Sequence, residues 1–162
     1  MILYIIRHTW AVNRDDADGD DARRPLTEKG RQRFACLVEQ LATRGFAPTC
    51  IASSPLVRCR QTAEILADHL SGQPKIVRLD ALRPCSDLAE TIAWTKKHRG
   101  HEQLAWVGHA PDVSEMAAAL IGDLGAWIRF TKGAVAAIRF DGAIQAGQGV
   151  LLWHVTAKIL GC

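Results

Sequence analysis

The feature that most constrains the fold is a regular alternation of short apolar runs with amphipathic segments. Runs of strand-like composition lie at residues 2–6, 50–52, 76–79, 104–107, 134–140 and 150–155, and helix-like segments separate all but the last two. This alternation predicts an α/β protein of three layers, α/β/α, with a central, largely parallel mixed sheet and right-handed crossovers. The last two strands follow each other through glycine-rich turns, so we expect them to pair antiparallel.

Four helices are expected between the strands. The first begins after Thr27, a good N-cap residue, because apolar side chains then recur at helical spacing from Phe34 to Leu41. The others cover about residues 56–70, about residues 87–97, and a segment that begins near Pro111, where proline is tolerated in the first turn. Since no repeat and no break in composition divides the chain, residues 1–162 are expected to form a single domain.

Charge and cysteine content narrow the classes of function. The net charge of +3 is too small to predict binding to nucleic acid or to a membrane, and the apolar N-terminal run is too short for a signal peptide, which favours a cytoplasmic protein. Five cysteines, an odd number without a CxxC pair, argue against a disulfide framework and a zinc site, so most are expected to be buried thiols. The run of aspartate and glycine at residues 15–21 predicts a mobile surface loop rather than a metal site.

Arginine and histidine side chains follow three of the predicted strands. Arg7 and His8 come directly after the first strand, Arg58 comes shortly after the second, and His109 follows the fourth. Ligands of open α/β sheets bind where the carboxyl ends of the strands meet, so these side chains are expected to converge. Arginine offers a permanently charged fork to phosphate oxygens, and histidine can be a nucleophile near neutral pH. The sequence therefore predicts a phosphoryl site.

The order and spacing of these residues resemble the histidine phosphatase superfamily. The matching segments are Arg7-His8, Arg24-Pro25-Leu26-Thr27, Ser53-Ser54-Pro55 with Arg58 and Gln61-Thr62-Ala63, and Gly108-His109-x-Pro111. The short chain and the segment Pro84-Cys85-x-Asp87 are similar to the small bacterial phosphohistidine phosphatases of the SixA type. The resemblance implies a phosphoglycerate mutase-like fold and a metal-independent phosphatase without a cofactor.

The same resemblance implies the roles of the site residues. His8 would be phosphorylated and the adduct then hydrolysed by water, while Arg7, Arg58 and His109 would hold the phosphoryl oxygens. The chemistry of such a step requires a neutral His8, oriented by a backbone hydrogen bond, and suggests that His109 is a cationic or hydrogen-bond-donating partner. Arg24 either approaches the site, as in the family, or offsets the acidic loop.

Four positions are less well defined. Asn13 half-matches an asparagine of larger members, with a loop-turn role as the alternative. Thr9 stands where the family usually has glycine, and would either donate its hydroxyl to the oxyanion or crowd the pocket. Asp87 and Glu90 are candidates for the general acid, although either could simply favour a helix start.

The absence of a clear general acid bears on the substrate. A phosphorylated imidazole can carry its own proton and leave as neutral imidazole, whereas an alkoxide leaving group needs an acid from the enzyme. The leading hypothesis is therefore hydrolysis of phosphohistidine on a protein, such as a histidine phosphotransfer domain. The alternatives are a broad phosphomonoesterase for small phosphorylated substrates and a catalytically weak phosphate-binding protein.

Overall fold

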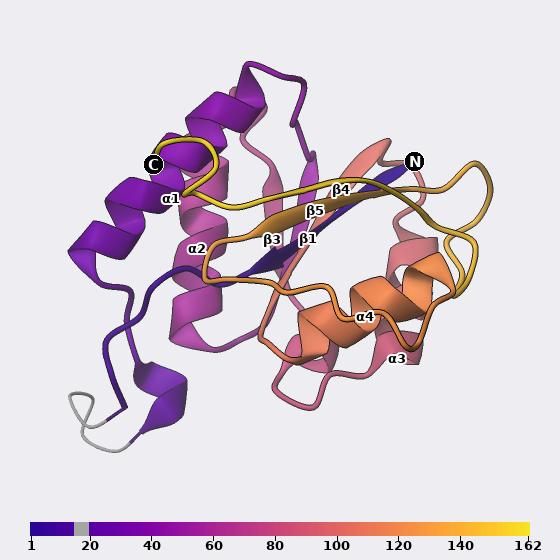
Figure 1. Ribbon diagram of the computed structural model, residues 1–162, viewed down its shortest axis with the longest axis horizontal. Coiled ribbons are helices and arrows are strands. Elements are labelled where there is room, and N and C mark those ends of the chain that lie inside the picture. Colours follow the sequence, from indigo (N-terminus) through magenta and orange to yellow (C-terminus); the bar gives the residue numbers. More distant parts are fainter. Residues whose placement is uncertain (15–19) are drawn as a thin grey trace.

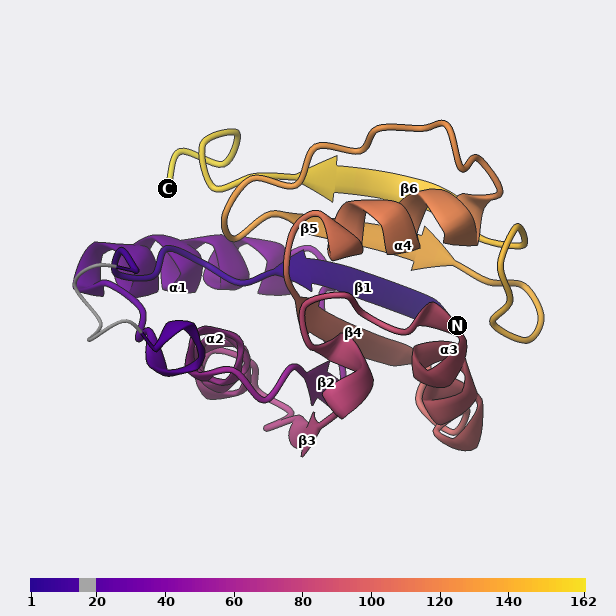
Figure 2. The same ribbon diagram turned by 90° about the horizontal axis from the view of Figure 1, so that it is seen from below.

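The protein is built on one mixed sheet with helices on both of its faces (Figures 1 and 2). The computed structural model describes residues 1–14 and 20–162. The order of the strands in the sheet is β3-β2-β4-β1-β5-β6. Their bounds are β1 Ile2–Arg7, β2 Cys50–Ser53, β3 Lys75–Arg78, β4 Gln103–Gly108, β5 Val135–Arg139 and β6 Val150–Val155. Strands β1 to β4 run parallel, while β5 is antiparallel to β1 and to β6. The predicted fold class and the antiparallel final pair are thereby confirmed.

The four predicted helices are present, with ends displaced by a few residues at most. They are α1 Glu28–Ala42, α2 Val57–Asp68, α3 Leu88–Lys97 and α4 Asp112–Ile121, with short 3-10 turns η1 Asp21–Arg23 and η2 Asp80–Leu82. Figure 2 shows α1 and α2 on one face of the sheet, and α3 and α4 on the other. Each helix covers the sheet with its apolar side, as the three-layer prediction requires.

Strand β1 explains why the chain begins with a continuous apolar run. Leu3 and Ile5 point into the core beneath α4, whereas Tyr4 and Ile6 point into the core beneath α1 and α2. Because successive side chains of a strand face opposite sides, a strand covered on both faces needs apolar residues at every position. The central position of β1 in the sheet is therefore encoded in its composition.

The start of α1 is fixed to the segment that leaves β1. The Thr27 hydroxyl oxygen accepts a hydrogen bond from the Gly30 N–H at 3.0 Å, which is the predicted N-cap. The Thr27 N–H donates to the carbonyl oxygen of Trp10 at 2.9 Å. Gly30 allows this close approach, since a Cβ at that position would lie 2.6 Å from the Trp10 carbonyl oxygen.

The cysteines differ from expectation in one respect. Cys36 on α1 and Cys162 form a disulfide, which corrects the prediction that argued against disulfides. The two residues are 126 positions apart in sequence, and only the fold brings the C-terminal segment onto α1, where Arg33 donates hydrogen bonds to the Cys162 carbonyl oxygen. Cys50 and Cys59 are buried free thiols, as expected, and Cys85 is exposed.

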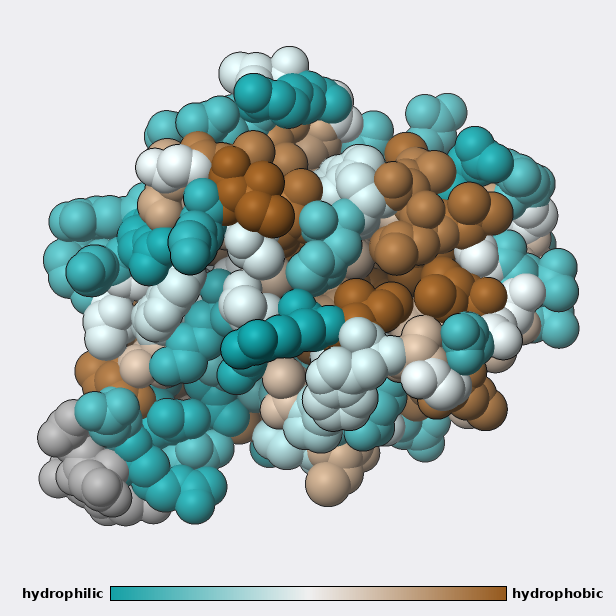
Figure 3. Space-filling view, in the orientation of Figure 1, coloured by the Kyte–Doolittle hydropathy of each residue, from teal (hydrophilic) through white to brown (hydrophobic). Residues whose placement is uncertain are grey.

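The surface divides into regions of different polarity. Hydrophilic side chains surround η1, and apolar side chains gather on the side of the edge strand β6 (Figure 3), where Val150, Leu151 and Leu152 are exposed. Among the described residues, no helix combines the length and the apolar character that crossing a membrane would need. The polar region around η1 borders the ends of the parallel strands.

Candidate active site

The carboxyl ends of β1, β4 and β2 bring the predicted arginines and histidines to one pocket of about 400 Å³. Arg7 and His8 end β1, His109 follows β4, and Arg58 lies in the first turn of α2, just after β2. Neighbouring parallel strands end at the same edge of the sheet, so residues far apart in sequence meet there. The ring centroids of His8 and His109 are 5.3 Å apart. The convergence predicted from the strand ends is therefore present in the fold.

His8 is buried and held by the backbone. Its Nδ1 lies 2.8 Å from the carbonyl oxygen of Thr9, and because a carbonyl can only accept, Nδ1 must carry the proton. Within the described residues no hydrogen bond engages Nε2, whose lone pair is therefore available to a ligand in the pocket. Burial lowers the pKa of His8 to about 3, and the positive charges of Arg58 and Arg7 act in the same direction. The ring is neutral at physiological pH, as a nitrogen nucleophile must be.

His109 is coupled to Arg58. The Arg58 Nη2 lies 3.2 Å from His109 Nδ1, and since a guanidinium only donates, Nδ1 accepts and Nε2 carries the proton. That Nε2–H donates to the Ser54 hydroxyl oxygen at 2.9 Å. Burial and the charge of Arg58 lower the pKa of His109 to about 4. His109 is therefore a neutral hydrogen-bond donor rather than the cation that was the other expectation.

Two arginines retain unpaired donors in the pocket. Arg7 Nη1 donates to the carbonyl oxygen of Phe130 at 2.8 Å, and Arg58 Nη1 donates to the carbonyl oxygen of Asp21 at 2.7 Å. The Nε atoms of Arg7 and Arg58 are buried and have no acceptor among the described residues. Both guanidinium groups line the pocket and carry permanent positive charge, so the arrangement suits a phosphate-like anion.

Thr9 is turned away from the pocket. Its hydroxyl donates to the Gly30 carbonyl oxygen at 3.1 Å, and its N–H donates to the Thr62 hydroxyl oxygen at 3.2 Å. The side chain is fully buried between β1 and the start of α1, and it does not line the pocket. In this geometry Thr9 neither supplies a hydroxyl to an oxyanion nor crowds the space beside His8.

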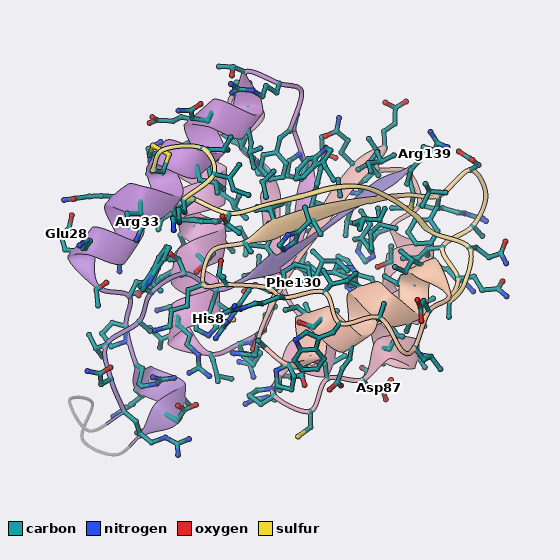
Figure 4. The ribbon with its side chains drawn as sticks, viewed as in Figure 1. His8, Glu28, Arg33, Asp87, Phe130 and Arg139 are labelled. Atoms are coloured by element: carbon teal, nitrogen blue, oxygen red, sulfur yellow. A yellow bond between two sulfur atoms is a disulfide. The ribbon has the colours of Figure 1, made fainter. Side chains whose placement is uncertain are left out.

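The remaining predicted residues fall into two groups. Arg24 lines the pocket, where its Nη1 donates to the Val12 carbonyl oxygen at 3.1 Å. Asn13 is exposed and does not line the pocket. Asp87 caps α3 by accepting from the Glu90 N–H at 2.9 Å, both side chains are exposed, and Figure 4 shows Asp87 well away from His8. These two carboxylates have the helix-start role that was the alternative.

Sequence reasoning missed the carboxylates that do line the pocket, Asp21 and Asp112. Asp21 belongs to the run expected to be a mobile loop; residues 15–19 of that run lie outside the described residues, but Asp21 is placed in η1. One signal could have found it, because it stands three residues before Arg24, the spacing at which side chains meet in a helical turn. Asp112 follows Pro111 at the start of α4 and accepts from the Ser86 hydroxyl at 3.2 Å.

Asp21 bridges two of the arginines. Its Oδ2 lies 3.0 Å from Arg58 Nη2, and its Oδ1 lies 2.9 Å from Arg24 Nε. The contact between Arg24 Nε and Asp21 Oδ1 is an ion pair and is not a hydrogen bond. Partial burial acts to raise the pKa of Asp21, but the charges of Arg58 and Arg24 outweigh it and lower the pKa below its usual range. Asp21 is therefore ionised at neutral pH.

No metal cluster accompanies this site in the part of the chain that the structure describes, and the thiol closest to His109 is unreactive. No group of three or more histidine, cysteine, aspartate or glutamate side chains is placed to hold a metal ion there. The Cys59 sulfur lies 3.5 Å from His109 Nε2, but burial raises the pKa of this thiol to about 12, so it stays protonated. The chemical groups that line the pocket are two imidazoles, four guanidinium groups, the Lys132 ammonium, the Cys85 thiol and two carboxylates.

Comparison with known families gives one match, to the model of the histidine phosphatase superfamily (branch 1), over residues 3–115. An uncharacterized protein of Picosynechococcus sp. is 36% identical to the chain over 162 residues, covering 97% of this chain and 96% of its own length. The phosphohistidine phosphatase SixA of Escherichia coli is 27% identical over 159 residues, which cover 96% of this chain and 94% of SixA.

The similarity extends to solved structures. The structure of the protein histidine phosphatase SixA complexed with tungstate superposes with a TM-score of 0.87 at 27% identity, covering 99% of each chain. A structure of an α-ribazole-5′-phosphate phosphatase of Escherichia coli matches with a TM-score of 0.75, but at 18% identity it shares the fold alone. The relatives at full coverage include small phosphatases of the SixA type.

Proposed function

The chain belongs to the histidine phosphatase superfamily, where it is SixA-like, and we propose that this phosphatase removes the phosphoryl group from phosphohistidine on a protein. The reaction proceeds through a covalent phosphoryl adduct of His8. Arg7 and Arg58 bind the phosphoryl oxygens, and His109 orients Arg58 by accepting a hydrogen bond from its guanidinium group. The observation that carries the proposal is the neutral His8, whose Nε2 has no hydrogen-bond partner among the described residues and which lines one pocket with Arg7 and Arg58.

The geometry supports a two-step displacement. The lone pair on His8 Nε2 attacks phosphorus, a phosphorus–nitrogen bond forms, and the bond to the leaving group breaks with its electron pair going to that group. A water molecule then attacks the phosphorus of the adduct, the phosphorus–nitrogen bond breaks with its electron pair returning to Nε2, and the proton of the water leaves with the released phosphate. The charge of the transferring group is spread over its oxygens, where guanidinium donors stabilise it without reorganisation.

The carboxylates support a leaving group that needs no proton from the enzyme. Asp87 and Glu90 lie outside the pocket, and Asp21 is held ionised by Arg58 and Arg24. Asp112 accepts a hydrogen bond from the Ser86 hydroxyl. A protonated phosphoimidazole leaves as neutral imidazole, so it suits this pocket better than an alkyl phosphate does. The similarity to proteins named as phosphohistidine phosphatases points to the same substrate class.

The proposal is tested by comparing two substrates on the purified protein. A phosphorylated histidine phosphotransfer domain is expected to be hydrolysed with kcat/KM at least about a hundredfold higher than a sugar phosphate, because of the difference in leaving group. A higher kcat/KM for the sugar phosphate would instead establish the small-molecule phosphomonoesterase. No turnover of either substrate would support a phosphate-binding protein.

The covalent step is tested by rapid quench and mass spectrometry of the intact protein. An acid-labile adduct of one phosphoryl group is expected on the wild type and not on His8→Ala, which should lose at least about 10⁴-fold in turnover. His69→Ala is the matched control, since His69 is a partly exposed histidine paired with Glu39 outside the pocket. An adduct that persists in His8→Ala would reject His8 as the nucleophile.

A further inference from the structure

A carboxylate lies on the guanidinium group that is proposed to hold the phosphoryl group. Asp21 contacts Arg58 twice, through Oδ2 to Nη2 at 3.0 Å and through its carbonyl oxygen to Nη1 at 2.7 Å. Its other carboxylate oxygen pairs with Arg24 at 2.9 Å, and both Asp21 and His8 line the same pocket. A phosphoryl oxygen bound to Arg58 beside His8 therefore has a negatively charged neighbour.

The charges that face Asp21 come from each segment packed against it. Arg58 from α2 and Arg24 from the segment after η1 are in direct contact, and the exposed Arg14 lies 3.5 Å from Oδ1. His109 stands behind Arg58, with its Nδ1 3.2 Å from the Arg58 Nη2 that also contacts Asp21. With pKa values of about 3 and 4, His8 and His109 stay neutral between pH 6 and 8. Over that range Asp21 keeps a constant negative charge.

We propose that Asp21 is a specificity-determining residue, which selects a phosphoryl ligand that presents a proton to its carboxylate, either on a phosphoryl oxygen or on the ring of the leaving group, and disfavours a dianion that presents none. The inference rests on the proposed function, because it places the phosphoryl group between His8 and Arg58. Two anionic oxygens on the same guanidinium repel each other, whereas a proton between them makes a short, strong O–H···O⁻ hydrogen bond. The positive charges of the arginines alone would bind the dianion more tightly. The negative charge of Asp21 reverses that order of affinity.

This selection names a class of substrate. Phosphate monoesters of hydroxyl groups are largely dianions at neutral pH. A phosphohistidine with a protonated ring carries two negative charges on the phosphoryl group and one positive charge on the ring, so its net charge is −1. Its ring N–H can donate to Asp21, the phosphorus–nitrogen bond can break with its electron pair going to nitrogen, and neutral imidazole leaves. Asp21 accepts a hydrogen bond in this step and transfers no proton.

The experiment measures binding of inorganic phosphate by calorimetry at pH 6 and pH 8, at constant ionic strength. Phosphate changes from monoanion to dianion over this range. The wild type is expected to bind total phosphate about tenfold more weakly at pH 8, following the fall in the monoanion. Asp21→Asn keeps an oxygen acceptor for Arg58 and removes the charge, so its affinity should be equal at the two pH values or higher at pH 8.

Two further variants separate charge from structure. Asp21→Glu retains the carboxylate and should restore the weaker binding at pH 8. Asp20→Asn is the matched control, because Asp20 is an exposed neighbour that caps η1 and does not line the pocket, and it should bind as the wild type does. Each variant is compared with the wild type by thermal unfolding, so that a misfolded protein is recognised.

The outcomes distinguish this inference from the proposed function. The role of Asp21 is overturned if the wild type binds phosphate equally well or better at pH 8. It is also overturned if the pH profile of Asp21→Asn matches that of the wild type. Neither result bears on the His8 adduct, which has its own test. Absence of phosphate binding at both pH values overturns the phosphoryl site and the inference together. A reversed pH dependence confined to Asp21→Asn supports the selection of a ligand that presents a proton to Asp21.

Discussion

Replacing Gly30 by alanine should destabilise the fold and misplace the nucleophile. The added Cβ would lie 2.6 Å from the Trp10 carbonyl oxygen and 2.8 Å from the Trp10 Cβ, where ordinary contact begins at 3.4 Å. Trp10 is two residues after His8, and its carbonyl oxygen also accepts the hydrogen bond from Thr27 that anchors α1. The clash therefore falls on the segment that sets the position of the His8 ring.

The expected loss of stability is the sum of one stabilising and two destabilising effects. Alanine is a better helix former than glycine by about 1 kcal/mol. Overpacking costs about 1–3 kcal/mol, and the upper end applies because the clash includes a backbone oxygen, which cannot rotate aside. Weakening the Thr27–Trp10 hydrogen bond costs about 1 kcal/mol more. We expect Gly30→Ala to lower the free energy of unfolding by about 2–3 kcal/mol, and Tm by roughly 4–10 °C.

The assay is urea denaturation together with turnover, using Gly72→Ala as the matched control. A Cβ on Gly72 meets nothing within 4 Å, so that variant should be neutral or slightly stabilising and fully active. Displacement of His8 by a fraction of an ångström should reduce kcat of Gly30→Ala by about 10- to 100-fold. Wild-type stability in Gly30→Ala would refute the close approach of α1 to Trp10, and lower stability with wild-type kcat would refute its link to the nucleophile.

Three other perturbations test separate parts of the structure. The pKa values of His8 and His109 are about 3 and 4 in the fold, against about 6.5 in an unfolded chain, so the unfolded chain alone takes up protons as pH falls through 6.5. The free energy of unfolding should therefore fall by about 4 kcal/mol from pH 7 to pH 5, and His8→Gln should remove about half of that loss in denaturation curves. Reducing the Cys36–Cys162 disulfide should lower stability by about 2–5 kcal/mol, and Cys36→Ser should make stability independent of reductant. Asp87→Ala should lose about 1 kcal/mol with the cap of α3, and a fall in kcat would show instead that Asp87 acts in catalysis.

The site could be predicted because a general rule of sheet topology applies to residues that the sequence identifies. Arg7, His8 and His109 follow apolar runs, and the carboxyl ends of parallel strands share one edge of the sheet, so their convergence needed no knowledge of loop geometry. The N-cap role of Thr27 could also be predicted from the sequence, because an N-cap is a local property of a few residues. Predictions succeeded where a local pattern or a general rule of topology determined the outcome.

Predictions failed where the path of the chain between elements decided the outcome. Asp21 is one of several aspartates of similar local context, and its position on Arg58 depends on where η1 lies against the start of α2. The pairing of Cys36 with Cys162 depends on where the C-terminal segment lies on α1. The direction of the Thr9 hydroxyl depends on the approach of Gly30, which no local pattern records.

The place of β1 at the centre of the sheet has a consequence for how the protein is made. Ile2 pairs with Gln103 on β4 and with Arg139 on β5, so both neighbours of the first strand are synthesised long after it. At about 5–20 residues per second, β1 waits on the order of 10 s before either partner exists. Throughout that interval the ribosome exposes an unpaired apolar strand, and His8 has no pocket. The proposed catalytic centre can therefore assemble only after β4 and β5 have been synthesised.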